Sequence, residues 1–171
     1  MPAARKRRDS IALVGTGNLA SVLGPALRAA GYTIEEVVSR PLPKSQRRAG
    51  KLAKKLRAKA VILADAALTA NVIWLCHTDD AIPQTAIHLS QRPGWHGRIV
   101  FHSSGALTSD VLAPLKRAGA HVASLHPMMT FVPGTSPGMK GVTFAIEGDR
   151  KAVSEARAIA RALKAEFFAI Q

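Results

Sequence analysis

The chain has 171 residues, of which 47% are hydrophobic, and its formal net charge is +13. This length suits one domain that buries its own hydrophobic core, and the single cysteine, Cys76, excludes an internal disulfide. No apolar run approaches the roughly 18 residues of a membrane span, and the N-terminus lacks the apolar core of an export signal. We therefore expect a soluble cytoplasmic protein without a membrane partner, in which Cys76 is a buried, unreactive thiol.

The positive charge is concentrated in two segments. Four cations lie in Arg5–Arg8, and nine more lie between Arg40 and Lys59. We expect residues 1–8 to form a disordered basic tail, followed by one domain over residues 9–171. Aromatic residues make up only 5% of the chain, and Trp74 and Phe101 fall in strands that we expect to be buried. Few rings remain to stack on bases, so no specific nucleic-acid partner is expected.

Strand-like and helix-like segments alternate along the chain, which predicts a mainly parallel, doubly wound sheet with helices on both faces, a three-layer α/β/α fold. The expected strands are Ile11–Val14, Thr33–Ser39, Ala60–Leu63, Asn71–Cys76, Arg98–His102, His121–Leu125, Val142–Ile146 and Glu166–Ile170. The expected helices are Leu19–Ala30, Lys44–Lys59, Asp80–Ser90, Thr108–Ala118 and Arg150–Leu163, the last capped by Asp149. Gly134–Gly141 is expected to be a flexible loop, and Phe167 and Phe168 to be exposed apolar residues on the last strand.

A glycine-rich turn follows the first expected strand, in the pattern Gly15-x-Gly17-x-x-Ala20. In a Rossmann-type turn the first glycine makes the tight bend, the second lets the backbone approach a pyrophosphate, and the small third residue lets the helix pack on the strand. The free N–H groups of the helix then face the phosphates. We therefore expect a dinucleotide site rather than an ordinary glycine turn, with the pyrophosphate held by Gly15, Thr16, Gly17, Asn18 and Leu19.

The second strand ends in Ser39 and Arg40, where a carboxylate would bind the free 2′-hydroxyl of an adenosine ribose. A guanidinium and a hydroxyl instead suit a 2′-phosphate, which favours NADP over NAD. The cationic helix that follows carries an apolar stripe, and two interpretations of its outer face stay open. It is a solvated face, or its first turn helps to hold the extra phosphate.

Polar residues follow three further strands at the edge where ligands bind in an open parallel sheet. They are His77 and Thr78 after the fourth strand, His102, Ser103 and Ser104 at the end of the fifth, and His126 before Pro127 at the end of the sixth. We expect His77, Thr78 and Ser103 to lie beside the nicotinamide. Ser104 and His126 are the candidate catalytic residues, which polarise or protonate the substrate. The alternative is that these residues only cap helices or turn the chain. The spacing of the other histidines does not indicate a metal site.

Five sequence blocks resemble a known family. They are Val14–Ala20, Val38–Arg40, His102–Leu107, Ser124–Pro127 and Phe144–Asp149. The family is that of Rossmann-like oxidoreductase-type proteins with a C-terminal domain of unknown function, relatives of pyrroline-carboxylate reductase, deazaflavin-dependent NADP oxidoreductase and prephenate dehydrogenase. The resemblance implies NADP at the first two blocks and, by analogy with the His-Pro of prephenate dehydrogenase, a role for His126 at a substrate hydroxyl. It also implies an all-helical domain after the last strand that forms a homodimer, whereas this chain stops at Gln171.

The sequence therefore predicts an NADP(H)-binding domain of an oxidoreductase-like protein. The expected chemistry is hydride transfer to or from a small carbonyl, imine or hydroxyl compound. A non-catalytic NADP-sensing or scaffold module is the alternative, because the helical domain that completes the pocket in related enzymes is not in this chain.

Overall fold

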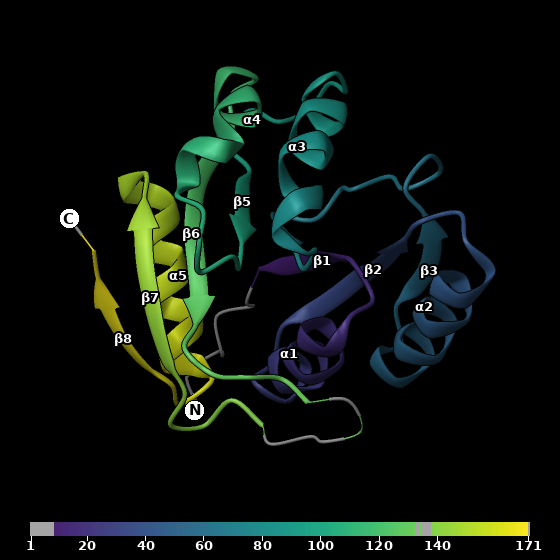
Figure 1. The fold of residues 1–171 in the computed structure, drawn as a ribbon, viewed down its shortest axis with the longest axis horizontal. Coiled ribbons are helices and arrows are strands. Elements are labelled where there is room, and N and C mark those ends of the chain that lie inside the picture. The colour runs from purple at the N-terminus through teal and green to yellow at the C-terminus, as the bar shows by residue number, and fades with distance from the viewer. Residues whose placement is uncertain (1–8, 133, 135–137, 171) are drawn as a thin grey trace, which may run out of the picture.

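Eight strands form one sheet in the order β3-β2-β1-β4-β5-β6-β7-β8, with helices on both faces (Figure 1). The computed structural model describes residues 9–132, 134 and 138–170. The strands are β1 Ser10–Val14, β2 Thr33–Ser39, β3 Lys59–Ile62, β4 Val72–Leu75, β5 Ile99–His102, β6 His121–Pro127, β7 Thr143–Gly148 and β8 Glu166–Ala169. The α-helices are α1 Asn18–Ala29, α2 Pro43–Leu56, α3 Ile82–Ser90, α4 Ala113–Arg117 and α5 Arg150–Ala162. Short 3₁₀ helices, η1 Asp79–Ala81 and η2 Ser109–Leu112, precede α3 and α4.

The expected α/β/α fold and its eight strands are confirmed. Neighbouring strands are parallel, with the exception of the antiparallel pair β6 and β7. The carboxyl ends of β1, β2, β4, β5 and β6 therefore lie at one edge of the sheet. In a parallel sheet this edge is where a ligand meets the loops, so the polar residues predicted after these strands come together there.

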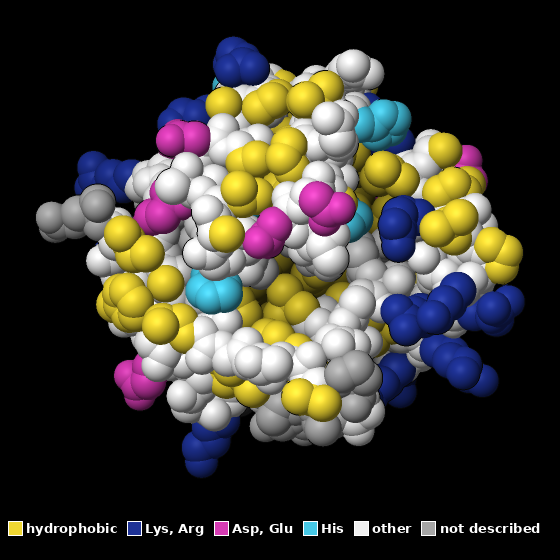
Figure 2. Space-filling view, in the orientation of Figure 1, with side chains coloured by type: hydrophobic (Ala, Val, Ile, Leu, Met, Phe, Trp, Pro, Cys, Tyr) yellow, Lys and Arg dark blue, Asp and Glu magenta, His cyan; other side chains and the backbone are white. Residues whose placement is uncertain are grey.

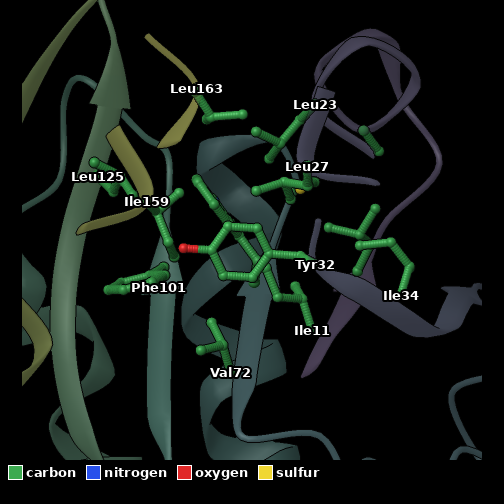
Figure 3. Packing of buried hydrophobic residues seen from close by; sticks show 14 of the residues in the cluster. Ile11, Leu23, Leu27, Tyr32, Ile34, Val72, Phe101, Leu125, Ile159 and Leu163 are labelled. Atoms are coloured by element: carbon green, nitrogen blue, oxygen red, sulfur yellow. The ribbon is translucent and has the colours of Figure 1, made fainter. Parts of the chain in front are cut away.

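Side chains of β1 alternate between two hydrophobic cores, which explains why this strand has no polar residue between Ile11 and Val14. Ile11 and Leu13 pack with α1, α2 and α5 on one face of the sheet. Ala12 and Val14 pack with α3 and α4 on the other. Strands covered on both faces are apolar throughout, as parallel strands in doubly wound folds are. Figure 3 shows Tyr32 in the first core, with its ring among side chains from α1 and the sheet.

A buried carboxylate fixes the chain between β3 and β4. Glu36 of β2 is buried and accepts hydrogen bonds from the backbone N–H groups of Ala67, at 3.1 Å, and Leu68, at 2.9 Å. Arg92 reaches the same segment and donates to the carbonyl oxygen of Ala66 at 2.9 Å. The segment is thus held by hydrogen bonds to its backbone, although it contains no regular secondary structure.

Some element ends differ from the sequence predictions, each for a local reason. The helix expected to reach Lys59 ends at Leu56, because Arg57 adopts the left-handed conformation with φ of 53°. Two expected helices begin with 3₁₀ turns, and their α-helical parts begin next to Pro83 and Pro114, residues favoured in a first helical turn. Asp149 stands at the N-cap of α5, but its carboxylate accepts the N–H of Val122 and the Lys116 ammonium instead of capping the helix.

Cys76 is buried as expected, and burial raises the pKa of its thiol to about 12, which keeps it protonated and unreactive. Phe168 is exposed, while Phe167 is partly covered and lies under the Arg161 guanidinium. The expected disordered tail, residues 1–8, and part of the expected loop, residues 135–137, lie outside the described residues. Within the described residues, no helix combines the length and apolar character needed to cross a membrane.

Candidate functional site

The turn after β1 leaves no space for a side chain at Gly15. This residue has φ of +124°, and a Cβ added there would lie 2.6 Å from the carbonyl oxygen of Cys76. Its N–H donates to the carbonyl oxygen of Val38 at 2.9 Å, and the N–H of Cys76 donates to Val14 at 2.8 Å. The turn is therefore held tightly between the ends of β2 and β4, and only glycine fits it.

Gly17 differs from Gly15 because its Cα faces open space. A Cβ added there would meet no atom within 4 Å. Gly17 is the N-cap residue of α1, and no side chain caps this helix. The start of α1 therefore presents backbone N–H groups without a side-chain acceptor beside an open approach, which is the arrangement that binds a phosphate group. On this observation the turn fits a dinucleotide pyrophosphate.

The glycine-rich turn also contacts the chain segment that follows β6. The side-chain amide of Asn18 donates to the carbonyl oxygen of Phe131 at 3.0 Å. Thr16 and Leu19 are partly exposed at the same turn. The five predicted pyrophosphate residues thus lie together at this turn, and Asn18 makes a contact with the protein that was not predicted.

The two residues predicted for a 2′-phosphate have different environments. Ser39 is only 4% exposed, and its hydroxyl donates to the carbonyl oxygen of Val61 on β3 at 3.5 Å. Arg40 is exposed, and its charge contributes to lowering the pKa of both His77 and Asp80. The guanidinium of Arg40 is therefore accessible to a ligand, whereas the hydroxyl of Ser39 is directed toward the neighbouring strand.

His77 carries a buried nitrogen that lacks a hydrogen-bond partner. Its Nε2 is buried and has no such partner within the described part of the chain. Burial lowers the pKa of His77, and the Arg40 charge lowers it further, so the ring is neutral at physiological pH. Its neighbour Thr78 shares a hydrogen bond with Asp80 that lowers the pKa of this carboxyl. Buried polar atoms normally have a hydrogen-bond partner, so the missing partner of His77 Nε2 indicates a position for a ligand or water at the end of β4.

Ser103 is tied into the sheet by its hydroxyl. Trp74 of β4 is fully buried and donates from its indole N–H to Ser103 Oγ at 2.8 Å. The hydroxyl of Ser103 in turn donates to the carbonyl oxygen of Leu125 on β6 at 3.0 Å. The side chain of Ser103 thus connects three neighbouring strands, and its predicted contact with a nicotinamide would involve its backbone rather than a free hydroxyl.

His126 has a fixed ring orientation. Its Nδ1 lies 3.0 Å from the carbonyl oxygen of Ser103, a contact that requires the proton on Nδ1. Gly105 packs against the ring, since a Cβ there would lie 2.7 Å from both Cε1 and Nε2 of His126. The ring is partly exposed, and Nε2 has no hydrogen bond to any described residue. Nε2 is therefore the nitrogen that can exchange a proton with a ligand.

Ser104 and His102 hold the turn after β5. Ser104 is buried, and its Oγ accepts the N–H groups of Ala106 and Leu107, both at 3.1 Å. His102 is fully buried, with Nε2 3.1 Å from the carbonyl oxygen of Thr108 and Nδ1 accepting the N–H of Ser104 at 3.2 Å. Burial lowers the pKa of His102, which keeps the ring neutral. His102 is thus a structural residue, and Ser104 has only its hydroxyl proton left for a ligand.

Figure 2 shows a hollow near the middle of one face of the molecule, with hydrophobic side chains on its floor and histidine side chains at its border. Among the described residues, no group of three or more His, Cys, Asp or Glu side chains could hold a metal ion. The uncapped start of α1 suits this edge to binding an anionic group, and the partly exposed ring of His126 suits it to exchanging a proton.

The sheet order, the glycine turn at the first strand and the polar strand ends define a Rossmann-type α/β domain. The sequence profile of the Rossmann-like domain family matches residues 2–127, and the chain belongs to this family. No curated protein matches the sequence.

Solved structures with the same fold include several oxidoreductases. A candidate NADP oxidoreductase from Bacteroides fragilis is 25% identical with a TM-score of 0.80, and the match covers 95% of this chain and 60% of that protein. A protein from Thermotoga maritima is 26% identical with a TM-score of 0.71, covering 94% and 56%. Prephenate dehydrogenase from A. aeolicus, solved with hydroxyphenyl propionate and NAD⁺, is 14% identical with a TM-score of 0.76, covering 96% and 60%. The chain therefore spans less than two thirds of each of these proteins.

Proposed function

We propose that this domain binds NADP(H) at the carboxyl edge of its sheet and contributes the proton-transfer residue of an oxidoreductase site. One observation carries the proposal. The open, uncapped start of α1 follows β1, and the fixed imidazole of His126 lies near the carboxyl end of β6. The two strands run in the same direction in one sheet, so both groups reach the same edge. The similarity to a candidate NADP oxidoreductase from Bacteroides fragilis supports a nicotinamide cofactor.

The cofactor would be held mainly by backbone groups. The N–H groups at the start of α1 would bind the pyrophosphate, with Thr16 and Leu19 beside it. Arg40 would pair with the 2′-phosphate, because it is exposed and the end of β2 offers no carboxylate for a free hydroxyl. The unpaired Nε2 of His77 would face the cofactor near the nicotinamide end.

When bound, the cofactor supplies or accepts the hydride. His126 would then handle the accompanying proton. In reduction of a small carbonyl or imine, Nε2 would give its proton to the substrate oxygen or nitrogen. In oxidation of a hydroxyl compound, Nε2 would accept that proton. The hydrogen bond from Nδ1 to the Ser103 carbonyl fixes the ring, so that Nε2 is the nitrogen available to the substrate in both the reduction and the oxidation. Ser104 would assist by donating its remaining hydroxyl proton to the substrate.

A second candidate function is a non-catalytic NADP-responsive module. It is favoured by the hydrogen bonds that occupy Ser103, Ser104 and His102 inside the fold, which leave His126 as the main group free for chemistry. The resemblance described above implies a helical domain that completes the pocket and forms a homodimer, and we propose this arrangement wherever such a domain accompanies this one. Turnover of NADPH with small carbonyl or imine compounds distinguishes the two functions. An enzyme oxidises NADPH with such compounds, and His126→Ala loses this activity at unchanged NADPH affinity. A sensor shows no turnover.

The first experiment is a fluorescence titration with NADPH and NADH at physiological salt. Wild-type protein is expected to bind NADPH more tightly, and Arg40→Asp to lose that preference. Lys54→Asp is the matched control, since it makes the same charge change at an exposed position near the end of α2 and should keep the preference. Equal binding of both nucleotides by the wild type, or equal effects of the two variants, would contradict the assignment of Arg40.

A further inference from the structure

The outer face of α2 carries cations without compensating acids. The helix contains Lys44, Arg47, Arg48, Lys51, Lys54 and Lys55 and no Asp or Glu. Several of these cations are three or four residues apart, a spacing at which like charges destabilise a helix. Lys54 and Lys55 lie in the last turn, where the helix dipole favours cations, but Arg48 and Lys51 do not gain in this way. Figure 2 shows Lys and Arg side chains gathered over α2, on the right of that view.

Three of these cations line a cavity between α2 and α1. The cavity has a volume of about 380 Å³, and Arg48, Lys51 and Lys55 form its α2 wall. The rest of the lining is uncharged, with Thr16, Asn18 and Ser21 from the glycine turn and the start of α1, and with Leu52, Val132 and Gly134. No Asp or Glu is among the described residues that line the cavity, so no carboxylate of its lining neutralises these cations.

The geometry points to a binding site for a small polyphosphate anion in this groove, separate from the site that contains Arg40. Seven residues separate Arg48 from Lys55, a rise of about 10 Å along the helix axis. An anion with charges spread over a comparable length, such as a di- or triphosphate group, contacts all three cations, whereas a single carboxylate does not. Arg40 does not line this cavity, and its charge acts instead on His77 and Asp80.

The groove also shares two residues with the proposed cofactor site. Thr16 and Asn18 belong to the glycine-rich turn and line the cavity as well. An anion in the groove and a pyrophosphate on the turn would repel each other across these residues, so each weakens the binding of the other. The groove is therefore a place where a free phosphate compound lowers the affinity for the dinucleotide.

The test uses inorganic triphosphate as the probe, with affinity measured by isothermal titration calorimetry at physiological salt. Lys51→Gln/Lys55→Gln removes two cations that line the cavity, and we expect its affinity to fall by roughly tenfold or more. Arg47→Gln/Lys54→Gln is the control, because it removes two exposed cations of the same helix that do not line the cavity, and its affinity should stay within about twofold of wild type. Gln has nearly the helix propensity of Lys and Arg, so both variants should keep α2.

Equal losses in the two double variants would overturn the proposal, since binding would then depend on total charge. So would an absence of triphosphate binding by the wild type. Binding of a single-stranded RNA oligomer that is tighter than that of triphosphate and depends on all four positions would also overturn it, in favour of an extended nucleic-acid surface. The probe contains no nicotinamide, so the result is independent of whether the chain binds NADP(H).

Discussion

The two glycines of the turn after β1 predict opposite effects of the same substitution. Gly15→Ala places a Cβ 2.6 Å from the Cys76 carbonyl oxygen at φ of +124°. Backbone strain of about 1–3 kcal/mol and overpacking of about 1–3 kcal/mol together give a loss of about 2–6 kcal/mol in the free energy of unfolding. For a domain of this size, that corresponds to a fall of roughly 5–20 °C in Tm.

Gly17→Ala adds a Cβ that meets no atom within 4 Å, at an ordinary φ of −79°. Alanine is a poorer N-cap than glycine, which lowers the free energy of unfolding by about 0.5 kcal/mol. Alanine also reduces the conformational entropy of the unfolded chain, which raises the free energy of unfolding by about the same amount. The Tm should therefore change by less than about 2 °C. The same methyl group occupies the approach to the start of α1. The affinity for NADPH should therefore fall at least roughly tenfold, a change of about 1.4 kcal/mol.

Thermal unfolding followed by circular dichroism and NADPH titration by fluorescence measure both effects. A Gly17→Ala protein that keeps wild-type stability and wild-type NADPH affinity would refute the turn as the pyrophosphate site. A Gly15→Ala protein as stable as wild type would refute the close contact with Cys76. Gly15→Ala thus tests the packing of the turn, and Gly17→Ala tests the binding of the nucleotide.

Three further predictions concern buried contacts. Gly105→Ala should displace the His126 ring, and so lower turnover or shift the His126 ring resonances in NMR spectra, while a Gly105→Ala spectrum with unchanged His126 resonances would contradict the contact. Glu36→Gln should lower the free energy of unfolding, measured with urea, by about 1.5–3 kcal/mol, because the NH₂ group of glutamine would face a buried backbone N–H donor. Glu35→Gln is the control: its side chain is partly exposed, and the free energy of unfolding should stay within about 0.5 kcal/mol of wild type. Burial lowers the pKa of His102 in the folded state below its ordinary 6.5, so the unfolded chain takes up this proton first and stability should fall as the pH drops below about 6.5. His102→Gln should reduce that slope by up to about 1.4 kcal/mol per pH unit, and an unchanged slope would contradict the assignment.

The fold could be predicted because its signals are local in sequence. Ile11–Val14 is apolar because both faces of β1 are covered, and the change to Gly15-x-Gly17 marks where the strand ends. The ends of helices were predicted less well. Arg57 adopts a left-handed conformation that usually signals Gly or Asn, so neither its residue type nor the apolar periodicity indicated that α2 ends at Leu56.

The candidate site could be predicted only as a set of residues at one edge. Gly15 and Arg40 could be identified because each follows a strand, and His126 because it lies near the end of one. The contacts that decide their roles join residues far apart in the chain, such as Trp74 with Ser103 and Asn18 with Phe131. No single-sequence pattern encodes such pairs. Ser39 and Ser104 illustrate the consequence, since a hydroxyl at a strand end has the same sequence signature whether it faces a ligand or the neighbouring backbone.

The hydrogen bond between Asn18 and Phe131 links the glycine-rich turn to the segment that follows β6. The amide of Asn18 holds the segment after β6, which begins directly beyond His126 and Pro127. A ligand at the turn that accepted this amide proton would break the bond to Phe131. Binding at the turn and the position of Phe131 would then be linked, so each would change the free energy of the other.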